Sequence, residues 1–156
     1  MLSDKEKTEI EEELQHLDHK SAACIEALRI IQKHRRWVSD EAVNDIAQIL
    51  EMSADEVDSV ATFYNLVFRK PVGKHIILIC DSISCWVMGS ENITQYISER
   101  LGIQLGETTS DGLFTFLTIP CLGNCDHAPS MMIDDNLYSD LTLEKIDSIL
   151  KEFIEF

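Results

Sequence analysis

Apolar residues recur at three- and four-residue spacing through about the first 66 residues of the chain, and this period predicts helices. Ser3 followed by Glu6 matches a capping box, which predicts the start of a first helix that reaches about Leu17. A second helix is expected from about Ser21 to about Arg36. The first half of the chain is therefore expected to be helical.

Capping serines also predict the starts of a third and a fourth helix. Ser39 precedes one apolar-periodic run, and Ser53 with Glu56 forms a second capping box before the next. We expect the apolar faces of these helices to pack against one another as a bundle. The residues expected to face inward on the second, third and fourth helices are Cys24, Leu28 and Ile31; Val43, Ile46, Ala47 and Leu50; and Val57, Val60, Ala61 and Tyr64.

The helical period stops at residues 68–74, where Pro71 and Gly73 indicate a linker or a tight turn. Beyond it the pattern changes to short apolar runs separated by turn residues, which is typical of strands. We therefore divide the chain into a helical domain, residues 1–70, and a mixed domain, residues 71–156.

The second half is expected to alternate strands and helices. The Asp111-Gly112 pair predicts a turn, and Thr142 can cap a final helix. The expected elements are a strand at 75–80, a helix near 91–101, a strand at 113–119, short strands at 131–133 and 137–138, and a helix after 142. Helices followed by a small α/β layer give an α+β fold class.

The charge of the chain excludes some classes of partner. Lys and Arg number 13 against 28 Asp and Glu, a net charge of −15. Nucleic acids and anionic membrane surfaces attract basic faces, so we expect neither as a partner. The N-terminal sequence MLSDKEKTEIEEE lacks the apolar core of a signal peptide, and the longest wholly apolar run, IILIC, is far too short to span a bilayer. A cytoplasmic protein without direct membrane insertion is expected.

Four cysteines in two pairs are the candidate site. Cys80 and Cys85 lie in CDSISC, and Cys121 and Cys125 lie in CLGNC. Each pair follows an apolar run expected to be a strand, so each is expected in a loop at a strand's end. If the two strands are neighbours, the loops can converge, and four thiolates are enough to hold one soft metal centre.

The spacing of the pairs leaves more than one metal centre open. Zinc accepts four cysteines, although C-x4-C and C-x3-C are wide for zinc knuckles. A [2Fe–2S] cluster takes two thiolates on each of its two irons, and its size suits wider loops, so spacing favours it over zinc. A redox dithiol would need C-x-x-C, and His127 lacks the partners of a Rieske site, so it is expected to be a loop residue. Cys24, alone on a helix face, fits a buried structural role.

Gly123 has a physical use in the second loop, since glycine allows a positive φ and a close approach of backbone N–H groups to sulfur. The chain also lacks G-x-G-x-x-G, P-loop and nucleophile-elbow patterns. If the site carries electrons, we therefore expect the donor and the acceptor to lie on other proteins.

The segments ATFYNLVFRKPVGKH, ICDSISC and IPCLGNCDHAPSMMID together resemble a known family. They are similar to the E subunits of bacterial NADH–quinone oxidoreductase, the small [2Fe–2S] subunit of respiratory complex I. The resemblance runs from near Ser21 to the last helix, and its cysteine pattern shows no departure from the family. Trp86 stands where relatives often have histidine.

The resemblance implies a fold, a site and a partner. It implies an N-terminal helical bundle followed by a thioredoxin-like [2Fe–2S] ferredoxin domain, with Cys80, Cys85, Cys121 and Cys125 as ligands of one cluster. It implies docking on the flavin-bearing F subunit, which holds FMN and oxidises NADH, among the other subunits of the peripheral arm on the cytoplasmic side of the inner membrane. We expect residues 1–70 to serve docking rather than cluster binding.

Overall fold

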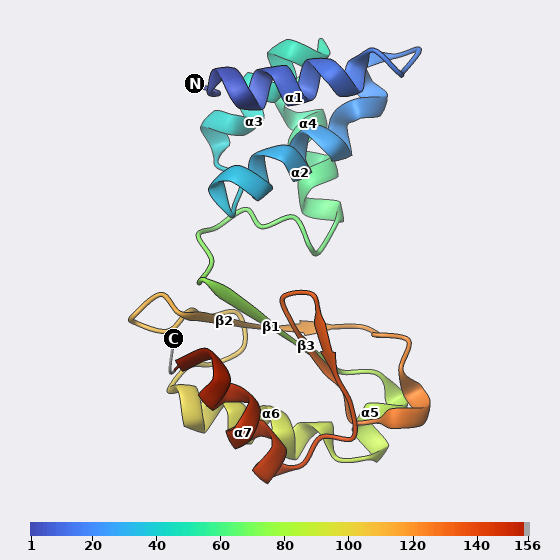
Figure 1. Ribbon diagram of the computed structural model, residues 1–156. Helices are drawn as coiled ribbons and strands as arrows, with labels where there is room; N and C mark the ends of the chain where they lie inside the picture. Colours follow the sequence, from blue (N-terminus) through green and yellow to red (C-terminus); the bar gives the residue numbers. More distant parts are fainter. Residues whose placement is uncertain (155–156) are drawn as a thin grey trace. The chain divides into compact units, whose positions relative to one another are not determined.

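The computed structural model describes residues 1–154 of the chain, which divide into two compact units. Met1–Pro71 contains only helices, and the unit that begins at Val72 contains every strand in the described part of the chain (Figure 1). Each unit has its own buried apolar cluster. The expected α+β class is confirmed.

The first unit is built from α1 (Asp4–Leu14), a short 3₁₀ helix η1 (Lys20–Ala23), α2 (Cys24–Arg35), α3 (Asp40–Leu50) and α4 (Ala54–Phe63). Both capping boxes form as predicted. The hydroxyls of Ser3 and Ser53 each accept a hydrogen bond from the backbone N–H of the glutamate three residues on, and the carboxylate of that glutamate accepts one from the backbone N–H of the serine. Ser39 caps α3 through the Ala42 N–H. The inward faces predicted for α2 and α3 are buried.

Three details of this unit differ from the sequence prediction. The first helix ends at Leu14 rather than near Leu17, and its last turn contains acidic residues and no basic one, which opposes the helix dipole. The second helix begins at Cys24, after the 3₁₀ turn, rather than near Ser21. Tyr64, predicted to face inward, is 43% exposed because α4 ends at Phe63 and Tyr64 takes an extended backbone.

The second unit contains a four-stranded mixed sheet in the order β2-β1-β3-β4. The strands are β1 (His75–Cys80), β2 (Phe114–Ile119), β3 (Met131–Ile133) and β4 (Asn136–Tyr138). β1 pairs with β2 in parallel, whereas β3 pairs with β1 and β4 in antiparallel fashion. β1 is therefore an interior strand, and its six-residue pairing with β2 is the longest in the sheet.

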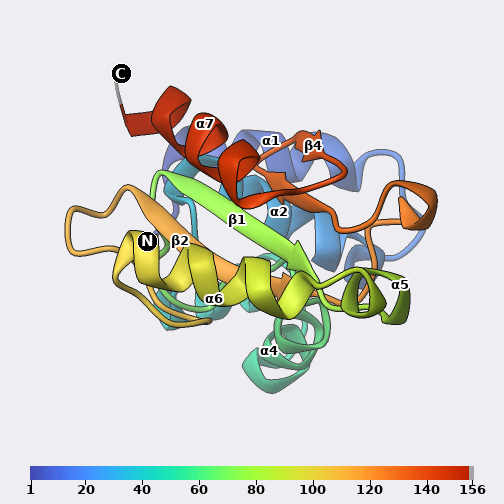
Figure 2. The same cartoon turned by 90° about the horizontal axis from the view of Figure 1, so that it is seen from below.

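Four helical segments complete the second unit: α5 (Ile83–Val87), α6 (Ser90–Leu101), the 3₁₀ helix η2 (Cys125–His127) and α7 (Leu143–Ile154). α6 and α7 cover the same face of the sheet (Figures 1 and 2). Ile97 of α6 and Ile146 of α7 join Ile77, Phe114 and Phe116 in the core beneath them. No helix within residues 1–154 is long and apolar enough to cross a membrane.

Candidate metal centre

The ends of β1 and β2 bring the two cysteine pairs to one edge of the sheet. The parallel register places Cys80 opposite Ile119, and the Asp81 N–H donates to the Ile119 carbonyl at 3.1 Å. Because both strands run the same way, the segments that follow them leave from the same edge. The two strands are therefore neighbours, as convergence of the pairs requires.

The first pair differs from the expected loop. Cys80 is the last residue of β1, and Cys85 lies inside the short helix α5. Both side chains are 2% exposed and pack with Ala128, with Leu122 against them. Burial raises the pKa of the Cys85 thiol to about 11, and its hydrogen bond with Cys80 adds to this effect. A bound cation reverses such a shift, because a coordinating thiol loses its proton to the metal.

The second pair is exposed and lies in the turn that follows β2. Cys121 precedes Gly123, which has a φ of 72° and whose N–H donates to the Cys121 sulfur at 3.3 Å. The left-handed backbone explains the choice of glycine, as the sequence predicted. Cys125 opens η2. His127 lies at the end of η2, beside Asp140 at 3.2 Å.

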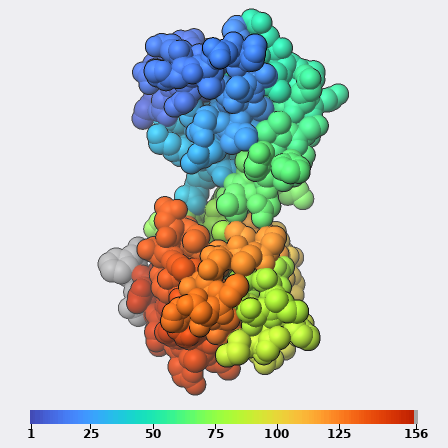
Figure 3. Space-filling model, turned by 90° about the vertical axis from the view of Figure 1, so that its right-hand side faces the viewer, coloured from blue at the N-terminus to red at the C-terminus, as the bar shows by residue number. Residues whose placement is uncertain are grey.

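The pairs approach one another through the segments that carry them. Cys85 lies close enough to Cys80 and to Cys125 that both raise the pKa of its thiol. The yellow-green segment with α5 and the orange segment with η2 adjoin on one face of the second unit (Figure 3). All five cysteines are free thiols, and Cys24 lies in the first unit, in a separate buried cluster.

Ser130 connects these segments, a role that the sequence analysis missed. Its carbonyl accepts from the Cys80 N–H at 3.1 Å, and its backbone also hydrogen-bonds to the Cys85 thiol. Its hydroxyl accepts from the Asn124 amide at 3.0 Å and donates to the His127 carbonyl at 3.0 Å. A buried serine between Pro129 and Met131 gives no signal in sequence, because it meets Cys80 and Cys85 only through the pairing of β1 with β3.

The donors fit an iron–sulfur cluster in number and kind. A [2Fe–2S] cluster takes two pairs of thiolates, and the site offers one buried pair and one exposed pair. Within residues 1–154, no three His, Cys, Asp or Glu side chains lie close enough together to hold one metal ion. The Gly123 N–H supplies the kind of donor to sulfur that adjusts a cluster's reduction potential.

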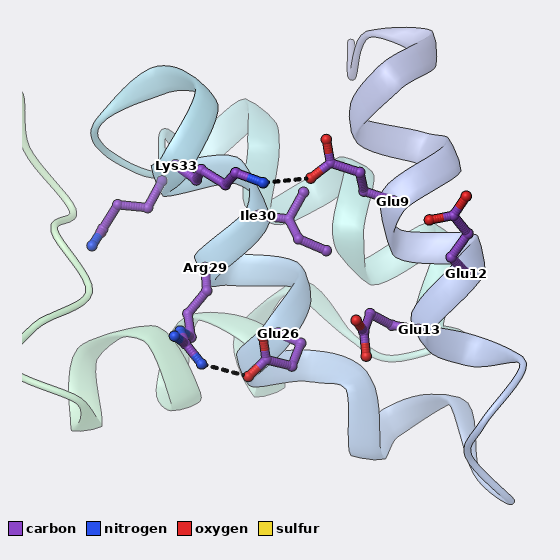
Figure 4. A pocket seen from close by; sticks show the side chains of 8 residues that line it. Glu9, Glu12, Glu13, Glu26, Arg29, Ile30 and Lys33 are labelled. Carbon is purple, nitrogen blue, oxygen red and sulfur yellow. Dashed lines mark hydrogen bonds and ion pairs between the residues drawn. The ribbon is translucent and has the colours of Figure 1, made fainter.

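The first unit has a concave surface of a different kind. A groove of about 710 Å³ lies between α1 and α2 and is lined by Glu9, Glu12, Glu13 and Glu26 together with basic side chains (Figure 4). Lys33 pairs with Glu9 at 3.3 Å, and Arg29 pairs with Glu26 at 2.7 Å. These exposed ion pairs form a solvated surface network, and no cysteine lines the groove.

The chain is similar to several known proteins. Residues 10–154 match the family described as Thioredoxin-like [2Fe-2S] ferredoxin. The E subunit of NADH-quinone oxidoreductase from Pseudomonas aeruginosa is 46% identical over 154 residues, which cover 99% of this chain and 93% of that protein. The E subunit from Escherichia coli K12 is 46% identical over 152 residues, covering 97% of this chain and 92% of that one.

A solved structure shares the fold at lower identity. The NAD+-reducing [NiFe]-hydrogenase in the H2-reduced state aligns with a TM-score of 0.74 and 20% identity. The match covers 85% of this chain but only 22% of the hydrogenase chain, so this chain spans about a fifth of that protein's length.

The family match defines the class of protein as a thioredoxin-like [2Fe–2S] ferredoxin, whose cofactor is one [2Fe–2S] cluster. Because the identity extends along nearly the whole chain, the protein belongs to the family of NADH–quinone oxidoreductase E subunits. The predicted family, cofactor and oxidoreductase class are confirmed, and the zinc alternative is set aside.

Proposed function

We propose that this chain is an electron-transfer subunit of NADH–quinone oxidoreductase. It exchanges single electrons with FMN on the flavin-bearing F subunit while that subunit oxidises NADH and the whole complex reduces quinone. The observation that carries the proposal is the position of two free cysteine pairs at the ends of neighbouring parallel strands. The electron-transfer role is also supported by the name that the relatives share.

Cys80, Cys85, Cys121 and Cys125 hold the cluster in this proposal. When bound, the cluster supplies a one-electron redox site. Cys80 and Cys85 are buried and keep water from one side of the site. Cys121 and Cys125 are exposed and form the side that a partner can approach, and the Gly123 N–H stabilises negative charge on the Cys121 sulfur.

The partner supplies the other redox groups. FMN and NADH bind the F subunit, and this chain belongs to the peripheral arm of the complex, on the cytoplasmic side of the inner membrane. The helical unit, Met1–Pro71, serves docking in this assembly. Its support is that the candidate cluster ligands all lie in the other unit, while Phe63 and Leu66 leave apolar surface exposed on this one.

Stopped-flow absorbance tests the proposal. The purified cluster-loaded chain is mixed with NADH under anaerobic conditions, alone and with the purified F subunit. We expect bleaching of the cluster's visible bands only when the F subunit is present. Rapid bleaching of the chain alone, or none with the partner although dithionite reduces the cluster, would contradict the proposal.

A further inference from the structure

The short helix α5 and the residue that follows it expose four apolar side chains next to the first cysteine pair. Ile83 is 71% exposed, Trp86 53%, Val87 68% and Met88 61%, whereas Cys85 between them is buried. Single apolar side chains on a surface need no explanation, but several on one short helix are typical of a contact surface. The tight turn of the chain around Cys85 leaves these side chains facing outward.

Trp86 also lines a groove of about 800 Å³ between α5, α6 and the end of β2. Its lining includes Asp81, Trp86, Glu91, Glu99, Leu105 and Thr118. Asp81 directly follows Cys80, and Trp86 directly follows Cys85. The groove is therefore lined by the two residues that directly follow Cys80 and Cys85, although neither cysteine lines it.

The charge of this groove is one-sided. Asp81, Glu91 and Glu99 line it, and no Lys or Arg does. Among residues 1–154 none of the three carboxylates forms an ion pair, although Glu99 accepts a hydrogen bond from Gln95 at 2.9 Å. The groove between α1 and α2 is different, since Lys33 and Arg29 line it and pair with two of its four carboxylates, Glu9 and Glu26.

The carboxylates and the indole of Trp86 together indicate which kind of side chain the groove can bind. Carboxylates along the wall attract a cationic side chain, and the exposed indole face of Trp86 suits a guanidinium or ammonium group stacked on it. Leu105, which also lines the groove, supplies apolar contact area for the aliphatic stem of that side chain.

We propose that this groove is the docking site for an Arg- or Lys-bearing segment of the flavin-bearing subunit. The inference rests on the function proposed above and assigns the contact that aligns the two proteins for electron exchange. Trp86 anchors the segment, Glu91 and Glu99 pair with its cations, and α5 packs against its apolar side chains. Electrostatic pairing of this kind also speeds association and makes it sensitive to salt.

Calorimetry on the full-length, cluster-loaded chain and the purified F subunit tests the proposal at low and high salt. Trp86→Ala is expected to weaken binding about tenfold, as loss of an aromatic anchor does. Trp86→Phe keeps an aromatic face and is expected to stay within about threefold of wild type. Glu91→Gln combined with Glu99→Gln is expected to weaken binding several-fold at low salt and to reduce the salt dependence of the dissociation constant.

The matched control is Asp135→Asn combined with Glu152→Gln. It removes two exposed carboxylates of the same unit, neither of which lines the groove, and so changes the net charge equally. We expect it to bind as wild type does. If this control loses as much affinity as the Glu91 and Glu99 variant, net charge alone explains the loss, and the proposal is overturned.

Two further outcomes would also overturn it. Wild-type affinity in both groove variants, while NADH still reduces the wild-type cluster through the F subunit, would reject the groove and leave the proposed function intact. A concentration-dependent dimer of the isolated chain that disappears in Trp86→Ala would assign the groove to a second copy. If Trp86→Ala fails to hold its cluster, the Glu91 and Glu99 variant decides, because those residues lie on α6 and outside the cysteine segments.

Discussion

Cys80 and Ile119 lie opposite each other at the ends of the parallel strands β1 and β2. Cys121 is only two residues beyond Ile119, so the strand pairing carries both cysteine pairs to one edge although about 40 residues separate them in sequence. Cys80 and Cys85 are buried and belong to β1 and α5, whereas Cys121 and Cys125 are exposed and belong to a turn and to the start of η2.

Replacing each proposed ligand by alanine is expected to abolish or severely weaken cluster binding. The variants are Cys80→Ala, Cys85→Ala, Cys121→Ala and Cys125→Ala, and each leaves one iron with a single protein thiolate. Iron and sulfide analysis and the EPR signal of the dithionite-reduced protein measure the loss.

Cys24→Ala is the control for these variants. Cys24 is buried among apolar side chains of the first unit, where burial raises the pKa of its thiol. Its replacement is expected to cost about 1–2 kcal/mol of packing energy and to leave the EPR signal unchanged. A normal signal in any of the four ligand variants, or loss of signal in Cys24→Ala, would refute the ligand assignment.

The sequence predicted those features that depend on local pattern. The capping boxes at Ser3 and Ser53 form because their partners lie three residues away. The two cysteine pairs lie at the ends of strands, because apolar runs precede them. Two features were missed for different reasons. Cys85 lies in a helix of only five residues, too short to show a helical period in the sequence. Ser130 meets the cysteines only after β3 pairs with β1, a contact between distant segments.

Gly73→Ala is expected to destabilise the second unit. A Cβ at Gly73 would lie 2.7 Å from the carbonyl carbon of Phe114, a backbone atom that cannot move without disturbing β2. The Gly73 N–H also donates to the buried Thr115 hydroxyl at 2.6 Å. The expected loss is about 3 kcal/mol of unfolding free energy, measured by urea unfolding with circular dichroism.

Gly102→Ala provides the comparison for this variant. Gly102 has a φ of 67° and no atom within 4 Å of an added Cβ, so only its left-handed backbone conformation opposes the change. Its expected cost is about 1 kcal/mol. Equal losses in the two variants would mean that the clash with Phe114 is relieved cheaply.

A pH dependence is expected from Glu6, which is 2% exposed. Arg35 donates from Nε and Nη2 to its two carboxylate oxygens, both at 2.6 Å, and this lowers the pKa of Glu6 to about 2. A carboxyl whose pKa is lower in the folded state stabilises the protein above its unfolded pKa, and that stabilisation disappears as the pH falls from about 5 to 2. The shift corresponds to about 3 kcal/mol.

Glu6→Gln is therefore expected to be less stable than the wild type at pH 7 and to lose less stability on acidification. Unfolding of the cluster-free protein, followed by circular dichroism between pH 7 and pH 3, measures the difference. Glu26→Gln is the control, because the exposed Glu26–Arg29 pair at 2.7 Å is worth at most about 0.5 kcal/mol. If stability falls equally with pH in the wild type and in Glu6→Gln, the contact with Arg35 does not lower the pKa of Glu6.

The last prediction concerns the helical unit. A chain that begins at Lys70 loses all of the first unit's helices. It also loses Arg69, which pairs with Asp40 and Asp58 of the same unit. It keeps every proposed cluster ligand and the Gly73–Thr115 hydrogen bond. We expect this truncated chain to retain the [2Fe–2S] visible spectrum, because the second unit has its own apolar core.

Its binding to the F subunit is expected to be much weaker, since stable subunit contacts bury on the order of 1,200–2,000 Å² and the groove at Trp86 supplies only part of such an area. Phe63→Ala in the full-length chain is the matched point variant, because Phe63 is 79% exposed and its replacement is expected to leave the fold intact. Pull-down and calorimetry measure the binding of the truncated chain and of Phe63→Ala to the F subunit. Full-strength binding by the truncated chain would assign docking to the second unit alone, and failure to assemble the cluster would show instead that the helices are needed for the ferredoxin fold.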